Sequence, residues 1–215
     1  MLIIHSTEII IKSILETHIL KAYTDNKIDL RIYANKMVSF CDFIGLEEEN
    51  CGRQKKNQKN LDYNLVIYMM HCLSKQQQNL EKMGYSFYTF RLKDIIVIDD
   101  KYFFCIGPEL IMPINNKTFL TFYKPPRTEN KKEENKEAEA DFSSPELLAM
   151  NSIPFKISYK TIYYSFGALA IYCLGNPSTY EHTKLYWFIK RCIGEECGKE
   201  CGKECQEEQR QLLFI

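Results

Sequence analysis

Glycine is absent from the first part of the chain, where Gly45 is the first of only nine glycines in 215 residues. A loop that wraps the phosphates of a nucleotide relies on glycine, because a backbone without side chains can approach phosphate oxygens closely. No Gly-x-Gly-x-x-Gly pattern occurs anywhere in the sequence. The sequence therefore lacks the usual glycine-rich phosphate-binding loop.

Net charge and long apolar runs are also missing. Lysine plus arginine (28) equals aspartate plus glutamate (28), so we expect neither a nucleic acid nor a membrane as partner. No stretch approaches the ~18 apolar residues of a membrane span, and Met1–His5 lacks the features of a signal peptide. The nine scattered cysteines are an odd number, which predicts reduced thiols in a cytoplasmic, non-secreted protein.

No metal site or nucleophile stands out among the cysteines and histidines. The four histidines are dispersed and match no catalytic spacing. The repeat containing Cys197, Cys201 and Cys205 could align three thiols on one side of a helix. The intervening Gly198 and Gly202 weaken such a helix, so we favour a flexible insertion over a zinc or copper site and expect no metal.

The strongest helical signal lies between Leu61 and Met83, where apolar residues recur at helical spacing. Lys75–Asn79 is polar and predicts a solvated face, and Gly84 predicts a left-handed end. Two further apolar segments, Lys160–Leu174 and Thr183–Ile193, also predict helices.

Short strands are expected in the middle and at the start of the chain. The middle pair is a hairpin, with Ile95–Ile98 and Lys101–Ile106 joined by an acidic turn. In the first part of the chain, strands are expected at Ile9–Ile11, Leu30–Tyr33 and Met37–Phe40, and a helix is expected at Ser13–Tyr23.

Polar segments divide the chain. Residues 46–60 form a candidate boundary between a small unit at 1–60 and a larger unit at 61–215. Residues 124–140 carry mixed charge and almost nothing apolar, which predicts a mobile loop, with a charged docking segment as the alternative. The cysteine repeat occupies 194–206.

The succession of a long helix, a glycine, a hairpin, a mobile loop and further helices resembles the C-lobe of the protein-kinase family. Ser144-Pro145-Glu146 resembles its Ala-Pro-Glu motif, and Ile162–Gly167 resembles the helix start Asp-x-Trp-Ser-x-Gly. Phe188–Ile193 and then Glu207–Arg210 resemble its late helix and arginine. The resemblance covers residues 61–215, and the C-terminal half is similar to kinase-like proteins of large DNA viruses. It implies an α+β fold with a mainly helical C-lobe, a β-hairpin and a reduced N-terminal lobe.

The positions that move phosphate in this family are replaced. Kinases use a catalytic aspartate, a lysine two residues on and a metal-binding asparagine five residues on. The resemblance puts Thr89, Arg91 and Asp94 at these three positions. Threonine cannot accept a proton as a carboxylate does, whereas Asp94 could still bind Mg²⁺. The Asp-Phe-Gly site falls near Gly107–Glu109, where Glu109 is the only carboxylate.

Two further roles follow from the resemblance. A buried Glu146 is expected to pair with Arg210, as the corresponding residues do in the family. Lys12 resembles the family's strand lysine, with Glu16 as a possible partner, although a surface pair on one helix face explains these two residues better.

The leading hypothesis is a pseudokinase that acts by binding a protein partner and needs no cofactor. An active Ser/Thr kinase that uses Mg-ATP, with Asp94 and Glu109 as metal ligands, is the first alternative. A carboxylate pair facing one cleft would favour it. A helical interaction protein with accidental resemblance is the second, favoured if no strand pair at 95–106 lies beside the 61–83 helix.

Overall fold

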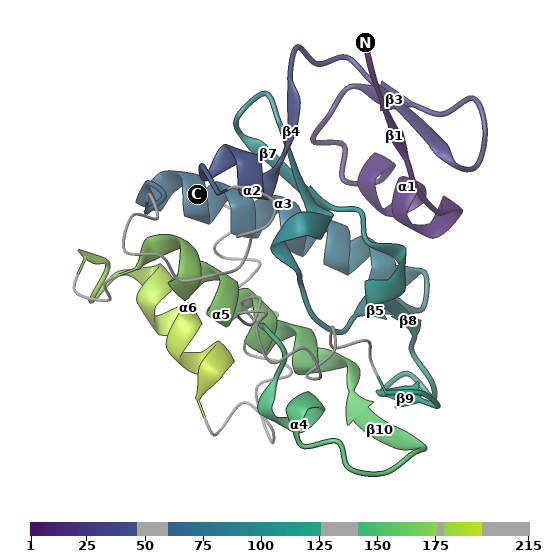
Figure 1. Cartoon of the computed structure of the whole chain (residues 1–215), viewed down its shortest axis with the longest axis vertical. Coiled ribbons are helices and arrows are strands. Elements are labelled where there is room, and N and C mark those ends of the chain that lie inside the picture. The colour runs from purple at the N-terminus through teal and green to yellow at the C-terminus, as the bar shows by residue number, and fades with distance from the viewer. Residues whose placement is uncertain (47–59, 126–141, 176–178, 195–215) are drawn as a thin grey trace.

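Four stretches of the chain, residues 1–46, 60–125, 142–175 and 179–194, are described by this computed structural model (Figure 1). Within them the chain combines α-helices with small antiparallel sheets, which confirms the expected α+β class. The helices are α1 (Glu8–Leu15), α2 (Phe40–Phe43), α3 (Tyr63–Lys82), α4 (Pro145–Leu148), α5 (Ile162–Leu174) and α6 (Lys184–Ile193).

The strands pair locally in small sheets rather than in one large sheet. In the three-stranded sheet near the start of the chain the order is β1 (Leu2–His5), β3 (Asp29–Ile32), β2 (Ala22–Tyr23). In the central three-stranded sheet the order is β4 (Met37–Ser39), β6 (Ile95–Ile98), β7 (Tyr102–Cys105). The two-stranded sheets pair β5 (Tyr85–Phe87) with β8 (Ile111–Pro113), and β9 (Phe119–Phe122) with β10 (Phe155–Ser158).

The predicted hairpin is present as β6 and β7, with Ile98 opposite Tyr102. Asp99 and Asp100 both adopt positive φ, 49° and 59°, the geometry of a tight turn that matches strand twist. The Asp99 carboxylate also accepts backbone hydrogen bonds from Asn35 (2.8 Å) and Lys36 (3.0 Å). The turn therefore holds the start of β4 beside the hairpin.

The first part of the chain differs from its prediction. The expected strand at Ile9–Ile11 lies inside α1, and the helix expected at Ser13–Tyr23 is replaced by the end of α1 and by β2. Three isoleucines of α1, at positions 10, 11 and 14, are buried against neighbouring strands. Packing of this helix face outweighs the weak strand preference of β-branched residues. The predicted strands at Leu30–Tyr33 and Met37–Phe40 are confirmed as β3 and β4.

Helix α3 confirms the prediction for Leu61–Met83, and Gly84 ends it with a φ of +80°. The solvated face expected at Lys75–Asn79 is wrong. Gln76, Gln77 and Asn79 are 0%, 1% and 4% exposed. This face is covered because α1, β5 and β7 all pack against α3.

The buried amides of α3 each bind groups on another element. Gln76 Nε2 donates to the Cys105 carbonyl (2.8 Å) and the Cys105 N–H donates to Gln76 Oε1 (2.9 Å). Asn79 Nδ2 donates to the Ser13 carbonyl at 3.1 Å. Gln77 binds β5 through Ser86 Oγ (2.9 Å). Buried polar groups are tolerated when they are paired in this way, so the amides join α1, β5 and β7 to α3.

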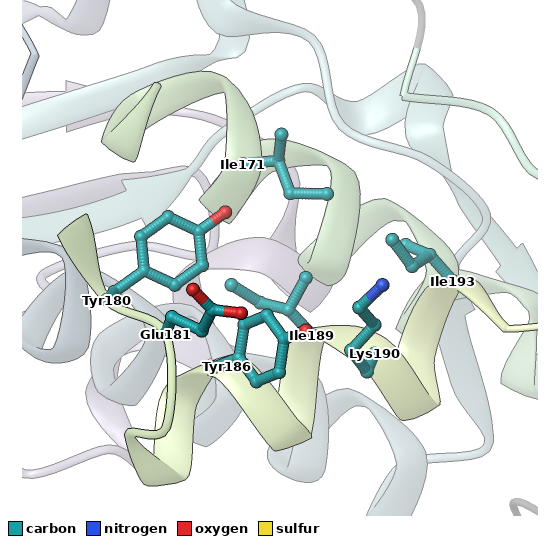
Figure 2. Close-up of a pocket in the computed structure, with 7 residues that line it drawn as sticks. All are labelled: Ile171, Tyr180, Glu181, Tyr186, Ile189, Lys190 and Ile193. Atoms are coloured by element: carbon teal, nitrogen blue, oxygen red, sulfur yellow. The ribbon is translucent and has the colours of Figure 1, made fainter. Parts of the chain in front are cut away.

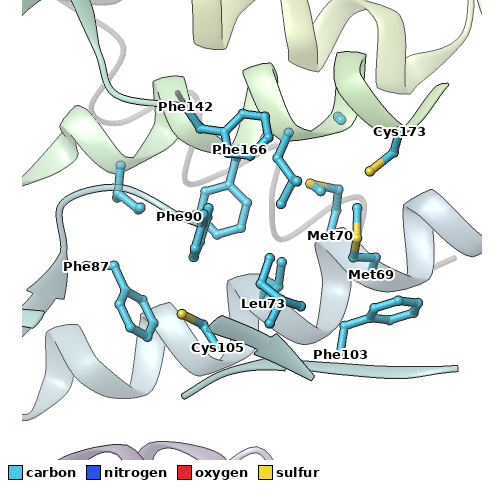
Figure 3. Packing of buried hydrophobic residues seen from close by; sticks show 14 of the residues in the cluster. Met69, Met70, Leu73, Phe87, Phe90, Phe103, Cys105, Phe142, Phe166 and Cys173 are labelled. Carbon is cyan, nitrogen blue, oxygen red and sulfur yellow. The ribbon is translucent and has the colours of Figure 1, made fainter. Parts of the chain in front are cut away.

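Two apolar clusters fill the interior. The larger gathers around α3 and α5, with Phe90 and Phe166 in edge-to-face contact at 4.9 Å between ring centroids (Figure 3). The smaller joins α1 and the first sheet to the outer face of the hairpin, through Ile96, Ile98 and Phe104. Residues 1–34 thus pack directly on the hairpin, and the predicted division of the chain at residue 60 stays a prediction.

The cysteines only partly match the expected reduced thiols. Cys72, Cys105, Cys173 and Cys192 are buried thiols that form no disulfide, and burial raises the pKa of Cys72 to about 12. A thiol with so high a pKa is unreactive near neutral pH. Cys41, in contrast, is disulfide-bonded, so the expectation of thiols throughout is wrong at this position.

Helices α5 and α6 approach closely at Gly167, one residue of the motif singled out in the sequence. A Cβ atom at Gly167 would lie 2.8 Å from Ile193 Cγ2 and 2.9 Å from Cys192 Cβ. Such short separations require side chains to move. Glycine at this position therefore sets how closely the two helices can pack.

Replacing Gly167 with alanine should lower the free energy of unfolding by about 1–2 kcal/mol, because overpacking outweighs the better helix propensity of alanine. Urea denaturation would measure this change. The cost should be smaller in an Ile193→Ala background, which removes one of the two close atoms. An equal cost in both backgrounds would contradict the close-packing explanation.

Several predicted features lie outside the described residues. These are residues 126–140 of the expected mobile loop, residues 195–206 of the cysteine repeat, and Arg210. In the part of the chain that is described, no helix is long and apolar enough to cross a membrane.

Candidate functional site

The loop after β5 meets the segment after β7. The Tyr88 N–H donates to the Leu110 carbonyl (3.1 Å), and the Ile106 N–H donates to the Asp94 carbonyl (2.8 Å). These bonds, with the pairing of β5 and β8, bring residues 88–94 beside residues 106–110. Three of the predicted site residues, Arg91, Asp94 and Glu109, are therefore neighbours.

Arg91 holds both predicted metal-binding carboxylates. Its Nε donates to Asp94 Oδ2 and its Nη2 donates to Glu109 Oε1. The side chains of Arg91 and Asp94 are 17% and 15% exposed, whereas Glu109 is 47% exposed. We call Arg91, Asp94 and Glu109 the Arg91 cluster. It is a partly buried ion-pair network with its open side at Glu109.

Burial and pairing act against each other in the Arg91 cluster. Burial raises the pKa of Asp94, although the hydrogen bond from Arg91 opposes this change. Burial also favours a higher pKa at Glu109, but a backbone hydrogen bond and Arg91 outweigh it and leave this pKa below its usual value. At Arg91, burial lowers the pKa, yet the hydrogen bonds to Asp94 and Glu109 raise it above its ordinary value. Arg91 is thus a permanent cation between the two carboxylates.

Gly107 lies in close contact with the Asp94 side chain of the cluster, a role that the sequence did not indicate. A Cβ atom there would lie 2.8 Å from Asp94 Cγ and 3.1 Å from Asp94 Oδ2. The Asp94 carboxylate therefore packs against the bare backbone of Gly107. The only sequence signal was a glycine directly before Pro108 and Glu109.

Thr89, at the position of the missing catalytic aspartate, is 6% exposed. Its Oγ1 accepts a weak hydrogen bond from Ser143 Oγ (3.4 Å) and donates to its neighbour's carbonyl at 3.5 Å. Ser143 belongs to the segment that leads into the Ser-Pro-Glu motif. Thr89 therefore serves as a buried contact between that segment and the loop after β5.

The Ser-Pro-Glu segment is fastened to α5. Ser165 Oγ donates to the Phe142 carbonyl at 2.7 Å, and the hydroxyls of Ser144 and Thr161 are hydrogen-bonded to each other. Ser144 also caps α4 by accepting from the Leu147 N–H (3.3 Å). The two stretches of sequence singled out by motif are therefore in contact.

Glu146 corrects one prediction. It is exposed at the start of α4, so the expected buried carboxylate is wrong. Ser144, two residues earlier, is the buried member of the motif. The predicted partner Arg210 lies outside the described residues, and the ion pair stays a prediction.

Lys12 lies on the solvent side of helix α1 and not on a strand. It pairs with Glu8 Oε1 at 2.8 Å, and this hydrogen bond raises the pKa of Lys12. The expected partner Glu16 is not the residue that it binds. The interpretation of Lys12 as a surface residue on a helix face is therefore favoured, with a different acidic neighbour.

Metal chemistry gains no further support. Among the residues that the structure describes, no group of three or more histidine, cysteine, aspartate or glutamate side chains is placed to hold a metal ion. Asp94 and Glu109 could contribute two ligands only if Arg91 left them.

Comparison with known proteins leaves the site as the main guide to function. No protein-family model matches the chain, and no curated protein matches it.

Proposed function

We propose that the chain is a kinase-like protein without phosphoryl-transfer activity, a pseudokinase that acts by binding a protein partner in the cytoplasm. The observation that carries the proposal is the pairing of Arg91 with both Asp94 and Glu109. A cation that is part of the chain occupies the place where an active enzyme would need a metal ion. The protein then requires no cofactor.

The order of elements supports the finer fold assignment. Helix α3 is followed by Gly84, the β6–β7 hairpin, the Ser-Pro-Glu helix α4, then α5 and α6. This is the order expected for a kinase C-lobe. Hydrogen bonds of Ser144 and Ser165 join the Ser-Pro-Glu segment to the start of α5, so these two elements also pack together.

The chemistry of phosphoryl transfer supports the absence of activity. This reaction depends on a base or positioning group and on metal ions that neutralise the phosphate oxygens. Thr89 supplies no carboxylate and is buried. A Mg²⁺ ion beside Asp94 and Glu109 would be repelled by the Arg91 guanidinium. Residues 1–34 also cover three hairpin side chains, Ile96, Ile98 and Phe104, so these side chains are not exposed for contact with a nucleotide.

A divergent active kinase remains the second candidate for one specific reason. Asp94 and Glu109 do converge on one point, the Arg91 guanidinium. If Mg-ATP displaced Arg91, two carboxylates would be available to the metal. The third candidate, a helical interaction protein, was tied to the absence of a strand pair near α3. A strand pair is present, and β7 packs on α3.

Mg-ATP should neither raise the melting temperature of the protein nor give phosphate transfer to casein or to the protein itself. Differential scanning fluorimetry and radiolabelled ATP would measure the two effects. Stabilisation together with transfer that disappears in Asp94→Ala, but not in the exposed control Glu16→Ala, would establish the active kinase instead.

A further inference from the structure

Helix α6 presents a basic and aromatic face. Its charged residues are Lys184, Lys190 and Arg191, with no acidic residue in the helix. Its apolar residues Leu185, Phe188, Ile189 and Cys192 are buried on the other side of the helix. Trp187, the only tryptophan of the chain, is 55% exposed.

A small pocket lies beside this face, between α5, α6 and the segment that precedes α6 (Figure 2). Its volume is about 160 Å³. The lining is mainly apolar and aromatic, with one acid and one base, and comprises Ile171, Tyr180, Glu181, Tyr186, Ile189, Lys190 and Ile193.

Lys190 connects the pocket to the basic face. Its Nζ lies 5.6 Å from the centroid of the Tyr186 ring, within the range of a cation–π contact. This contact holds the ammonium group at the edge of the pocket. An anionic group above the pocket would meet Lys190, while an apolar side chain could enter beneath it.

We propose that Lys184, Trp187, Lys190 and the adjoining pocket form a docking surface for an acidic segment of a protein partner. One leucine-like or phenylalanine-like side chain of that segment would occupy the pocket. This proposal rests on the proposed function, since it names the site and the chemistry of the partner. We call these residues the α6 surface.

Charge complementarity identifies the partner. Lys184 and Lys190 meet no acidic residue of their own helix, so an acidic segment gains attraction and orientation. Trp187 supplies the large aromatic contact that often dominates protein interfaces. The small pocket provides an anchor point, which gives a peptide segment a defined register.

An anionic membrane fits the same surface less well. A bilayer surface attracts cations and tryptophan, but it uses no pocket of defined shape. Glu181 also lies at this pocket and is exposed, so it would repel a continuous layer of anionic headgroups, whereas a peptide segment can place its acidic side chains over Lys184 and Lys190 and its apolar side chain at the pocket. The observations therefore favour a peptide.

Intrinsic fluorescence offers a direct test because Trp187 is the only tryptophan in the full chain. The probe is a nine-residue peptide of aspartate and glutamate with leucine at the centre. Its titration should shift the Trp187 emission in a saturable way, and Lys190→Glu should weaken binding at least tenfold. Lys156→Glu, an exposed charge reversal on β10, should leave binding unchanged. Equal circular-dichroism melting curves would show that both variants fold.

Three results would overturn the proposal. The first is equal binding of a peptide in which asparagine and glutamine replace the acidic residues. The second is an emission shift with phosphatidylserine vesicles but not with the acidic peptide, which would assign the surface to a membrane. The third is burial of Trp187 in a dimer detected by sedimentation. None of these results bears on phosphate transfer, so failure here is distinguishable from failure of the pseudokinase assignment.

Discussion

Replacing Gln76 with alanine should lower the free energy of unfolding by about 3–5 kcal/mol, because each buried backbone group left without a partner costs about 1–3 kcal/mol. The Gln76 amide binds both the N–H and the carbonyl of Cys105, at 2.9 Å and 2.8 Å. Alanine removes both bonds and leaves a small cavity. Urea denaturation followed by circular dichroism would measure the change.

Gln78 gives a matched control. It is two residues along the same helix but only half-buried, and the same change to alanine should cost no more than about 0.5 kcal/mol. Equal costs at the two positions would show that the buried bonds to Cys105 contribute little. A larger cost at Gln76, with an unchanged denaturant slope, would locate the effect in the native state.

Replacing Arg91 with methionine should lower the free energy of unfolding at neutral pH by about 2–3 kcal/mol, somewhat below the ~3–5 kcal/mol of a fully buried pair. Methionine keeps a long side chain but removes the charge. Asp94, which is 15% exposed, then remains as a poorly solvated anion. Thermal and urea denaturation would measure the loss, and adding Asp94→Asn should recover part of it.

The loss in Arg91→Met should depend on pH in a defined direction. Burial raises the pKa of Asp94 in the folded protein, so this group lowers stability as pH rises from its unfolded pKa through its folded pKa. Removing Arg91 takes away the cation that opposes this increase in the pKa of Asp94. The cost should therefore be greatest at neutral pH and should shrink below the ordinary aspartate pKa, where Asp94 is neutral in both states.

Lys156→Met is the control for the pH effect. Lys156 is an exposed cation on β10, away from the Arg91 cluster, and its replacement changes the net charge by the same amount. We expect a small cost, within about 0.5 kcal/mol, because surface charges contribute little. A cost equal to that of Arg91→Met, or one independent of pH, would contradict the role given to the Arg91 cluster.

The arrangement of the Arg91 cluster shows how far the sequence could lead. The resemblance singled out Thr89, Arg91, Asp94 and Glu109 by position, and three of these four are neighbours. It did not indicate that Arg91 would bind both carboxylates. That outcome depends on the pairing of β5 with β8 and on the room that Gly107, without a side chain, leaves for the Asp94 carboxylate. No local pattern encodes either feature.

The helical face at Lys75–Asn79 illustrates the opposite error. Polar residues in succession normally indicate solvent, yet Gln76, Gln77 and Asn79 are buried. Amide side chains can be buried wherever another element offers matching donors and acceptors. Here Cys105 and Ser13 offer them, from positions distant in the sequence.

By itself, the sequence determined the elements whose signals are local: the long helix before Gly84, the hairpin around Asp99, and the two late helices. Periodicity and turn chemistry act over a few residues, so they can be read along the chain. The tertiary structure alone decided that Ile9–Ile11 is helical, that the amides of α3 are buried, and that Arg91 pairs with both Asp94 and Glu109. These outcomes depend on partner groups brought together by folding, because burial and charge pairing are properties of the neighbours in space.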